Sequence, residues 1–111
     1  MSFEATLAER VRHPLARKKG FVEKRMFGGL AFLRHGNMCV GVWKESLILR
    51  LGTTQAEKAL EHFFVREFDI TGRPMTGWVM IDHADLQNDD ELADWIAQAI
   101  RFVRTLPRKA K

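Results

Sequence analysis

Hydrophobic residues between Arg25 and Gly52 fall into three runs that are separated by two short polar gaps. Gly36-Asn37 lies in the first gap and Lys44-Glu45 lies in the second. Apolar runs joined by gaps this short are typical of β-hairpins, because two residues are enough to reverse an antiparallel strand. The pattern therefore predicts an antiparallel meander, and we expect the rest of the chain to cover this sheet.

A two-residue turn at Lys44-Glu45 sets the register of the second hairpin. The pairs that it places on the expected core face are Val42–Leu47, Val40–Leu49 and Met38–Leu51. The pairs that it places on the opposite face are Trp43–Ser46, Gly41–Ile48 and Cys39–Arg50. We therefore predict that Met38 is buried in the core and that Cys39 lies next to Arg50 on the other face.

The first hairpin admits two registers. A turn at Gly36-Asn37 pairs Leu33 with Val40 and Ala31 with Val42. A three-residue turn that includes His35 pairs Phe32 with Val40 and Leu30 with Val42 instead. The sequence does not choose between them, and both registers stay open.

Helical periodicity predicts a helix at the start of the chain. The residues that carry the apolar spacing are Phe3, Leu7, Val11 and Leu15. We expect a break or kink at Pro14, because proline lacks an N–H and disfavours helical geometry in the residue before it. The sequence Arg17-Lys18-Lys19-Gly20 then predicts a cationic helix end with a glycine stop.

Two more helices follow from capping patterns. Thr54 and Glu57 have the spacing of a capping box, which predicts a short helix continuing to Phe63. Asn88 is predicted to cap the last helix, with Glu91 as its partner. The apolar stripe of this helix consists of Leu92, Trp95, Ile96, Ala99, Ile100 and Val103.

Between these helices the pattern predicts two more strands. Phe64-Val65 and Phe68-Asp69-Ile70 are strand-like, a turn is expected at Thr71-Gly72-Arg73-Pro74, and Trp78-Val79-Met80-Ile81 is the last strand. The whole is an α+β domain with an antiparallel sheet and the order α-β-β-β-α-β-β-α. We expect residues 1–111 to form this single domain, with 107–111 as a frayed basic tail.

Composition limits the class of protein. The chain has 111 residues, of which 46% are hydrophobic and 29% charged, and no apolar run approaches the roughly 20 residues of a membrane helix. Acidic residues stand where a signal peptide would be basic, and the single cysteine permits no internal disulfide. We therefore expect a cytoplasmic protein. Its net charge of +4 permits anionic partners without requiring them.

Some motifs invite a chemical interpretation. Gly28-Gly29 could converge N–H groups on an anion, although a bend where the first strand meets the sheet is the favoured interpretation. Asp82-His83-Ala84-Asp85 lacks metal-ligand spacing, and Cys39 has no histidine placed to act as a base. No catalytic set can be assembled, so we predict a protein that is not an enzyme and holds no metal or cofactor.

Two surfaces are candidates for binding. The first would use Arg25, Arg50 and Arg73 as one cationic face, unless each arginine pairs with a nearby acid, and the strand residue Trp78 could be an anchor or half-buried core. The second would be a nucleic-acid surface made of Arg101, Arg104, Arg108, Lys109 and Lys111 together with Arg17-Lys18-Lys19. Basic helix ends that complement the helix dipole explain the second set without a ligand, and we favour that explanation.

Several of these motifs together resemble a known family. The segments Arg25-Met26-Phe27-Gly28-Gly29-Leu30, Asn37-Met38, Leu49-Arg50, Gly72-Arg73-Pro74-Met75 and Gly77-Trp78, with Trp95 in the closing helix, resemble the N-terminal domain of the TfoX/Sxy family of bacterial competence regulators. The resemblance covers nearly the whole chain. It implies helix, three strands, helix, two strands and helix, in a fold similar to secretion chaperones, and it makes the chain a stand-alone single-domain member.

The resemblance also implies a function. Longer members carry a second domain and act as transcriptional co-activators with the cyclic-AMP receptor protein. We therefore expect a non-enzymatic regulatory domain that binds a protein partner, such as a transcription regulator, with no membrane contact and with homodimerisation through a sheet edge as an option. The predicted partner surface is Arg25, Arg50, Arg73, Pro74, Met75 and Trp78, and the family-motif residues with a mainly structural role are Met26, Phe27, Gly28, Gly29, Gly72 and Gly77. Direct nucleic-acid binding is the alternative, and a small-ligand or enzymatic domain ranks third.

Overall fold

The computed structural model describes residues 5–26, 28–69 and 75–107. In these ranges, the helices are α1 (Ala5–Leu15), α2 (Thr53–Ala59) and α3 (Asp89–Val103), with a short 3-10 helix, η1 (His83–Asp85). The strands are β1 (Phe21–Met26), β2 (Gly29–Arg34), β3 (Asn37–Trp43), β4 (Ser46–Arg50), β5 (Val65–Glu67) and β6 (Trp78–Asp82). They form one antiparallel sheet in the order β1-β2-β3-β4-β6-β5. The predicted α+β class with an antiparallel sheet is confirmed.

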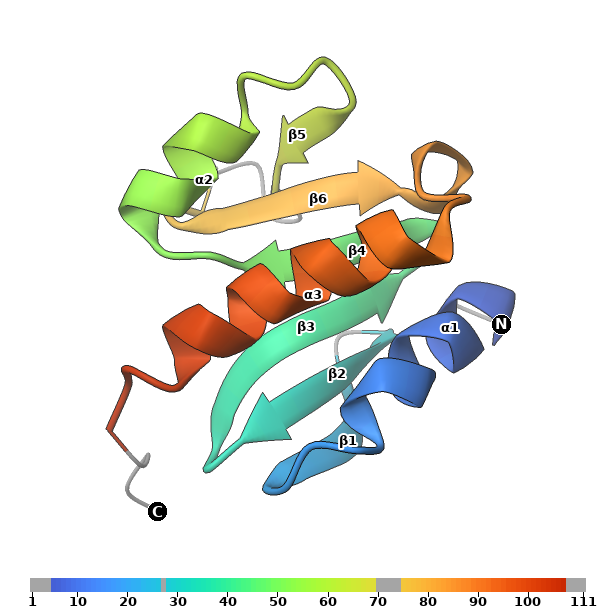
Figure 1. The fold of residues 1–111 in the computed structure, drawn as a ribbon, viewed down its shortest axis with the longest axis vertical. Helices are drawn as coiled ribbons and strands as arrows, with labels where there is room; N and C mark the ends of the chain where they lie inside the picture. The colour runs from blue at the N-terminus through green and yellow to red at the C-terminus, as the bar shows by residue number, and fades with distance from the viewer. Residues whose placement is uncertain (1–4, 27, 70–74, 108–111) are drawn as a thin grey trace.

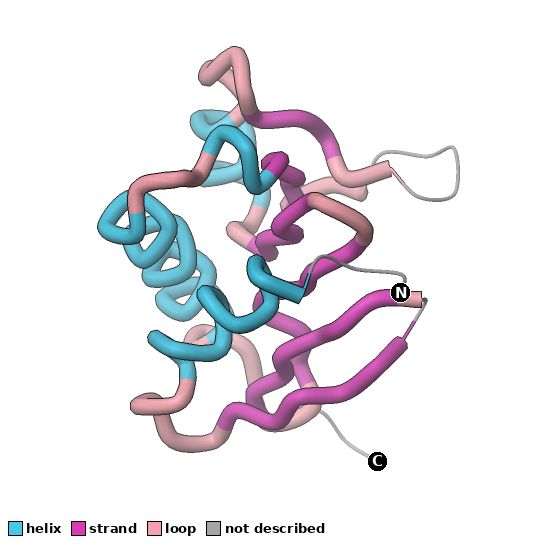
Figure 2. The backbone as a smooth tube through the Cα atoms, turned by 90° about the vertical axis from the view of Figure 1, so that its right-hand side faces the viewer, coloured by secondary structure: helices cyan, strands magenta, loops and turns pink. Residues whose placement is uncertain are grey.

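The helices α1 and α3 lie on the same face of the sheet (Figure 1). Figure 2 shows the sheet from its side, with the helices in a layer on one face and no described helix on the other. The helix α2 lies at one end, against β6. The domain therefore has a helix-covered face and a helix-free face.

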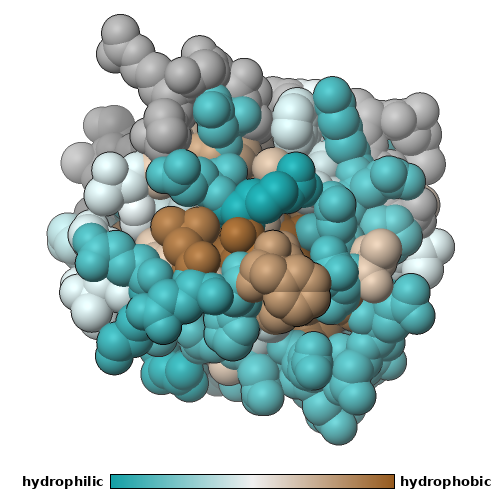
Figure 3. Space-filling view, turned by 90° about the horizontal axis from the view of Figure 1, so that it is seen from above, coloured by the Kyte–Doolittle hydropathy of each residue, from teal (hydrophilic) through white to brown (hydrophobic). Residues whose placement is uncertain are grey.

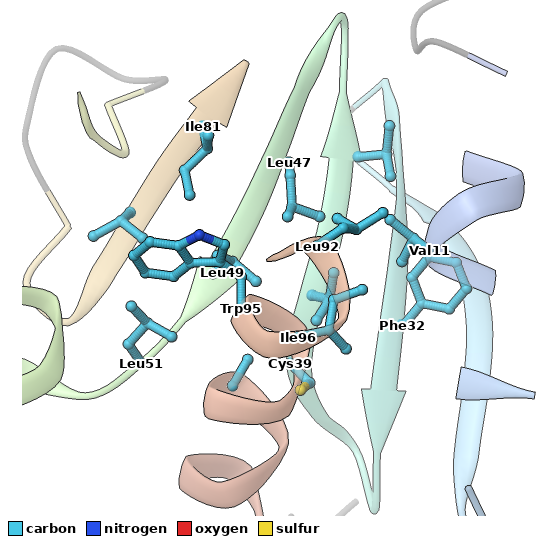
Figure 4. Packing of buried hydrophobic residues seen from close by; sticks show 14 of the residues in the cluster. Val11, Phe32, Cys39, Leu47, Leu49, Leu51, Ile81, Leu92, Trp95 and Ile96 are labelled. Carbon is cyan, nitrogen blue, oxygen red and sulfur yellow. The ribbon is translucent and has the colours of Figure 1, made fainter. Parts of the chain in front are cut away.

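The main core lies between the sheet and the two long helices. Figure 4 shows Leu92, Trp95 and Ile96 of α3 pointing into it, together with side chains from the sheet and Val11 from α1. Leu47, Leu49 and Ile81 have no exposed surface, so these side chains are removed from water. Burying side chains of this size contributes about 1.5–3 kcal/mol each, and it is the main force that holds the layers together.

A second, smaller cluster lies on the helix-free face. Its buried members are Ile48, Phe68 and Met80, and the half-buried Trp43 and Trp78 pack against them. The two clusters alternate along the strands, as expected when successive side chains point to opposite faces. Both faces of the central strands are therefore apolar, which explains why the sequence shows runs of hydrophobic residues and not a strict alternation.

The local predictions for the second hairpin and the last helix are confirmed. The pairs Val40–Leu49 and Val42–Leu47 have the predicted register. The Asn88 side chain accepts a hydrogen bond of 3.0 Å from the backbone N–H of Glu91. All six residues of the predicted α3 stripe are buried. The predicted last strand is β6, and it extends one residue further, to Asp82.

The pairing of β2 with β3 decides between the two registers that the sequence left open, and it places Met38 and Cys39 on faces other than those predicted. Phe32 pairs with Val40, as in the alternative that includes His35, but Leu33 pairs with Met38, so Cys39 is an extra residue in a β-bulge. His35 and Gly36 both have positive φ, which is the geometry of a two-residue type I′ turn.

The bulge turns Cys39 into the main core, where it is fully buried. Met38 moves to the helix-free face, where its methyl carbon lies 2.6 Å from the position that a Cβ on Gly41 would take. The predictions that Met38 is in the core and that Cys39 lies on the opposite face are therefore wrong. A single inserted residue exchanges the faces of all residues beyond it.

The number of strands also differs from the prediction. Residues 21–26 form a separate strand, β1, which pairs with β2, so the order is α-β-β-β-β-α-β-β-α with η1 before the last helix. Four of the six residues of β1 are exposed, and such a polar edge strand lacks the apolar pattern that marks the others. Of the predicted strand-like residues after α2, Val65 lies in β5, Phe68 packs in the second cluster, and Ile70 lies outside the described residues.

The predicted boundaries of the first two helices also change. Pro14 stays inside the last turn of α1, where it removes only one hydrogen bond, and the helix ends one residue later. The capping box at Thr54 is not formed, because the N-cap of α2 is Gly52, two residues earlier, and it has no side-chain cap. The helix ends at Ala59, and Phe63, predicted to belong to it, is 95% exposed.

Some predictions fall outside the described residues. They concern Phe3, Phe27, the turn at residues 71–74 and the tail at residues 108–111. In the described ranges, no helix combines the length and the apolar character needed to cross a membrane.

Candidate functional site

Arg50 lies where β4 ends and pairs with Trp78, the first residue of β6. Its guanidinium carbon lies 5.3 Å from the centre of the Trp78 ring and 5.8 Å from the centre of the Phe102 ring of α3. Both distances are within the range of cation–π attraction. Two aromatic rings from elements far apart in the sequence therefore hold one positive charge at this end of the sheet.

Among the residues that the structure describes, no ion pair neutralises the charge of Arg50. The residue is half-buried, and no carboxylate of the described residues forms a salt bridge with it. Arginine side chains at such positions usually pair with an acid, because partial burial makes an unpaired charge costly. Within the described ranges, the contacts found for the guanidinium of Arg50 are therefore those with the two aromatic rings.

Gly52 and Gly77 allow the loop after β4 to lie close to both β6 and α3. The carbonyl oxygen of Gly77 accepts hydrogen bonds from the N–H groups of Leu51 at 2.9 Å and Gly52 at 3.1 Å. Gly52 has φ 84° and ψ 158°, a conformation that is essentially limited to glycine. A Cβ on Gly52 would lie 2.6 Å from the ring of Phe102. The loop after β4 can therefore meet α3 this closely only because position 52 has no side chain.

These residues enclose a small open pocket of about 180 Å³. It is lined by Arg50, Gly52, Thr53, Thr76, Gly77, Trp78 and Phe102. The lining combines one cation, two hydroxyl groups and two aromatic rings. We call this set of residues the Arg50 pocket.

Arg25 and Arg50, the two described arginines of the predicted surface, lie on different faces of the sheet. Arg25 pairs with Leu30, which is part of the main core, so Arg25 points toward the helix side of the edge strand β1. Arg50 pairs with a residue of the helix-free face. Arg25 instead lies near Glu23, whose pKa is lowered mainly by hydrogen bonds from Arg12 and to a smaller extent by the charge of Arg25.

The remaining predicted partner residues are only partly described. Met75 is 44% exposed, and its backbone N–H donates to the carbonyl oxygen of Phe68 at 3.0 Å. Trp78 is half-buried, and its ring centre lies 5.8 Å from that of Phe68. The predicted residues Gly72, Arg73 and Pro74 lie outside the described residues. Met75 and Trp78 thus lie near the Arg50 pocket, and Trp78 is one of its walls.

The glycine pair at the start of β2 has a packing role. Gly28 is exposed with φ 75°, next to the β1–β2 connection. Gly29 is buried, and a Cβ there would lie 2.5 Å from the carbonyl oxygen of Val42. Gly29 therefore allows two strands to approach closely. Met26, two residues before the glycine pair, ends β1 and is half-buried.

Basic segments from three parts of the chain meet at one end of the molecule, at the bottom of Figure 1. Gly20 approaches the ring of His35, and the side-chain amide of Asn37 donates a hydrogen bond of 2.8 Å to the carbonyl oxygen of Pro107. The described cations on these segments are Arg17, Lys18, Lys19, Arg34 and Arg104. No Asp or Glu occurs in residues 10–22, 24–44 or 95–111, so no acid from these stretches offsets the charge. We call this surface the basic end.

The other predicted basic residues are placed as follows. Arg101, in the last turn of α3, is exposed. Arg108, Lys109 and Lys111 lie outside the described residues.

Asp82 and Cys39, the other residues considered for chemistry, have contacts that favour a structural role. The carboxylate of Asp82 accepts hydrogen bonds from Ser46 at 2.7 Å and from Arg66 at 2.9 Å. Burial raises the pKa of the Cys39 thiol to about 12, so the thiolate that would act as nucleophile or ligand is disfavoured. Within the described ranges no three His, Cys, Asp or Glu side chains form a group that could hold a metal ion.

An apolar surface lies at the end of the molecule where α2 and β5 are found. Figure 3 views this end and shows hydrophobic side chains at its centre, surrounded by hydrophilic ones. Phe63 is 95% exposed and contacts the half-buried Phe64 edge to face, with ring centres 5.5 Å apart. Phe64 in turn contacts Trp95 of α3, so this surface continues into the main core.

A comparison with family models identifies the chain. The model of the TfoX N-terminal domain matches residues 14–103 of the 111. The chain belongs to the TfoX N-terminal domain family. The resemblance found in the sequence is thereby confirmed, and membership indicates a regulatory or interaction role at the level of the family. No curated protein and no solved structure matches the chain.

Every residue that lines the Arg50 pocket lies inside the part matched to the TfoX N-terminal domain. Sequence analysis had singled out Arg50, Gly77 and Trp78 but not Gly52 or Phe102. Phe102 follows Trp95 by seven residues, a spacing that places both on one side of a helix and could have added it to the apolar stripe. No pattern in the sequence shows that its ring reaches Gly52.

Proposed function

We propose that this TfoX N-terminal domain is a non-enzymatic regulatory module that binds a protein partner through the Arg50 pocket and the adjoining Met75. The observation that carries the proposal is the half-buried residue Arg50, whose guanidinium lies over two aromatic rings and has no acidic partner among the described residues. Tryptophan and arginine are enriched among the residues that dominate binding energy at protein interfaces. The module would act by recruitment, with Arg50 supplying the charge and Trp78 the anchor.

The test compares binding by the wild-type domain with that by the variants Arg50→Ala and Met75→Ala. A partner enriched by affinity capture would be purified and its affinity for each variant measured by isothermal titration calorimetry. We expect Arg50→Ala to weaken binding by at least tenfold, as for residues at the centre of an interface. Lys24→Ala is the control, because Lys24 is exposed on β1, three strands from β4, and its removal changes the net charge equally. Unchanged affinity in both test variants would reject the proposed surface.

The basic end favours a second candidate function, binding of nucleic acid. Phosphate contacts by several Lys and Arg side chains give affinity that falls steeply with salt. The convergence of the loop after α1, the β2–β3 turn and the end of α3 supplies such a group of cations from three segments. It supports this candidate more strongly than the basic tail alone does.

Fluorescence anisotropy with labelled duplex DNA at low and near-physiological salt tests this candidate. Replacing Arg17, Lys18 and Lys19 by alanine should weaken binding and reduce its salt dependence if these cations contact phosphates. The matched control replaces Lys24, Lys44 and Lys58, three exposed lysines outside the basic end. Equal loss in both triple variants would mean that only the net charge matters, and the candidate would be rejected.

A further inference from the structure

We propose that the Arg50 pocket binds a carboxylate group that is carried on an apolar carbon. The inference rests on the proposed function, because it names the chemical group by which a partner would be recognised. Among the described lining residues, Arg50 contributes the one ionised side chain. A carboxylate carries one negative charge and therefore matches the pocket, whereas a phosphate dianion would leave one charge uncompensated at a partly buried position.

The guanidinium of Arg50 has the donor geometry that a carboxylate requires. A guanidinium that lies over aromatic rings is attracted through its face, while its N–H donors lie in its own plane. The guanidinium carbon of Arg50 lies 5.3 Å from the centre of the Trp78 ring and 5.8 Å from that of the Phe102 ring, within the range of this attraction. The in-plane donors can then form two parallel hydrogen bonds with the oxygens of one carboxylate.

The two rings also define what the carboxylate is attached to. Trp78 and Phe102 offer apolar surface near the charge, and Thr53 and Thr76 belong to the same lining. A carboxylate on an aliphatic carbon would place its carbon atoms against the rings and its oxygens at the guanidinium. Both the last residue of a peptide and an acidic side chain have this chemistry.

The pocket is formed before a ligand arrives. The carbonyl oxygen of Gly77 fixes the backbone of residues 51 and 52, and the conformation of Gly52 places the Phe102 ring at its closest approach to the loop. A site whose walls are held by the fold loses little conformational entropy on binding. A small carboxylate should therefore bind without the rest of a partner, with an affinity in the millimolar range.

The experiment follows backbone and arginine Nε–H signals by NMR while N-acetyl-leucine is titrated into the full chain. We expect saturable shifts of Gly52, Gly77 and the Arg50 side chain. The affinity obtained from them should be at least tenfold higher than for N-acetyl-leucine amide, which has the same carbon skeleton without the charge. Inorganic phosphate tests whether any anion suffices. Equal binding of the amide or of phosphate would overturn the proposal.

Two variants assign the binding to the guanidinium. Arg50→Ala should abolish the saturable shifts, and Arg50→Lys should weaken them, because an ammonium group keeps the charge but lacks the bidentate geometry. Lys24→Ala, the control defined above, should bind as the wild type does. Thermal unfolding of each variant shows that it is folded, and retained binding in folded Arg50→Ala would overturn the proposal.

Two peptides distinguish the sources of the carboxylate. One ends in leucine with a free chain end and contains no acid, and the other has an amidated end and one internal glutamate. Binding of the first alone assigns a chain end, and binding of the second alone assigns a side chain; binding of neither, although N-acetyl-leucine binds, overturns the peptide as the source. If no carboxylate binds while Arg50→Ala still loses the purified partner, the carboxylate inference fails and the proposed interaction surface stands.

Discussion

The substitution Gly52→Ala tests the geometry of the Arg50 pocket through the stability of the domain. The backbone at Gly52, with φ 84° and ψ 158°, lies in a region that costs other residues about 1–3 kcal/mol. The new Cβ would lie 2.6 Å from the ring of Phe102, so the ring must move by about 1 Å to reach ordinary contact distance. Together these effects should lower the free energy of unfolding by about 2–4 kcal/mol.

Urea and thermal unfolding followed by circular dichroism measure this cost. For a domain of this size, 1 kcal/mol corresponds to about 4 °C, so the Tm of Gly52→Ala should fall by about 8–16 °C. The matched control is Gly20→Ala, because Gly20 also has positive φ, at 87°, but its nearest neighbour would be 3.5 Å away, in ordinary contact. The free energy of unfolding of the control should fall only by the amount that backbone strain costs. A Gly52→Ala variant as stable as Gly20→Ala would refute the argument that Phe102 needs the missing side chain.

Three further predictions concern other parts of the fold. Replacing Asn88 by alanine should lower the free energy of unfolding by about 1 kcal/mol in urea, because the N–H of Glu91 loses its cap; a neutral result would mean that water replaces the cap. Cys39 has its pKa raised to about 12 by burial, so its contribution to stability is complete below pH 9 and is lost between about pH 9 and 12, as the unfolded chain ionises first. Cys39→Ala should therefore flatten the alkaline loss of Tm; an unchanged slope would contradict this. Phe63→Ser should change the stability by no more than about 0.5 kcal/mol, whereas Phe64→Ala should cost clearly more, since only the second ring packs on the core; equal losses would show that the exposed ring contributes to folding.

Elements held by local interactions were predicted well from the sequence. The hairpin around Lys44-Glu45 and the cap of Asn88 depend on residues a few positions apart, so their patterns are complete in a short window. The stripe of α3 is equally local, because helical spacing alone decides which side chains share a face.

The errors arose where distant contacts override local patterns. Thr54 has the residues of a capping box, but Gly77 holds the N–H of Gly52 and α2 begins earlier. The bulge at Cys39 cannot be read from residue types, because it is the packing of β3 against α3 that buries this side chain. The strand β1 escaped notice as a separate element, since an exposed edge strand lacks an apolar face.

The candidate site was predicted only in part, because it too depends on contacts between residues far apart in the sequence. Arg50 and Trp78 could be named from the motifs that resemble the family, but their pairing depends on the register of β4 with β6. Phe102 could not be joined to them, because its approach to Arg50 requires the end of α3 to lie over the loop after β4.

The order of strands in the sheet bears on how the chain folds. The strands β1 to β4 are neighbours in sequence as well as in space, so each pairing closes only a short loop. In contrast, Arg10 of α1 donates hydrogen bonds to the carbonyl oxygen of Leu86 and the carboxylate of Asp89, which is 79 positions away. We expect the meander to form first and this contact between the two ends to form after the rate-limiting step. Removing the Arg10 contact should then raise the unfolding rate and leave the folding rate unchanged. The contact between α1 and the start of α3 therefore lengthens the time that the domain stays folded.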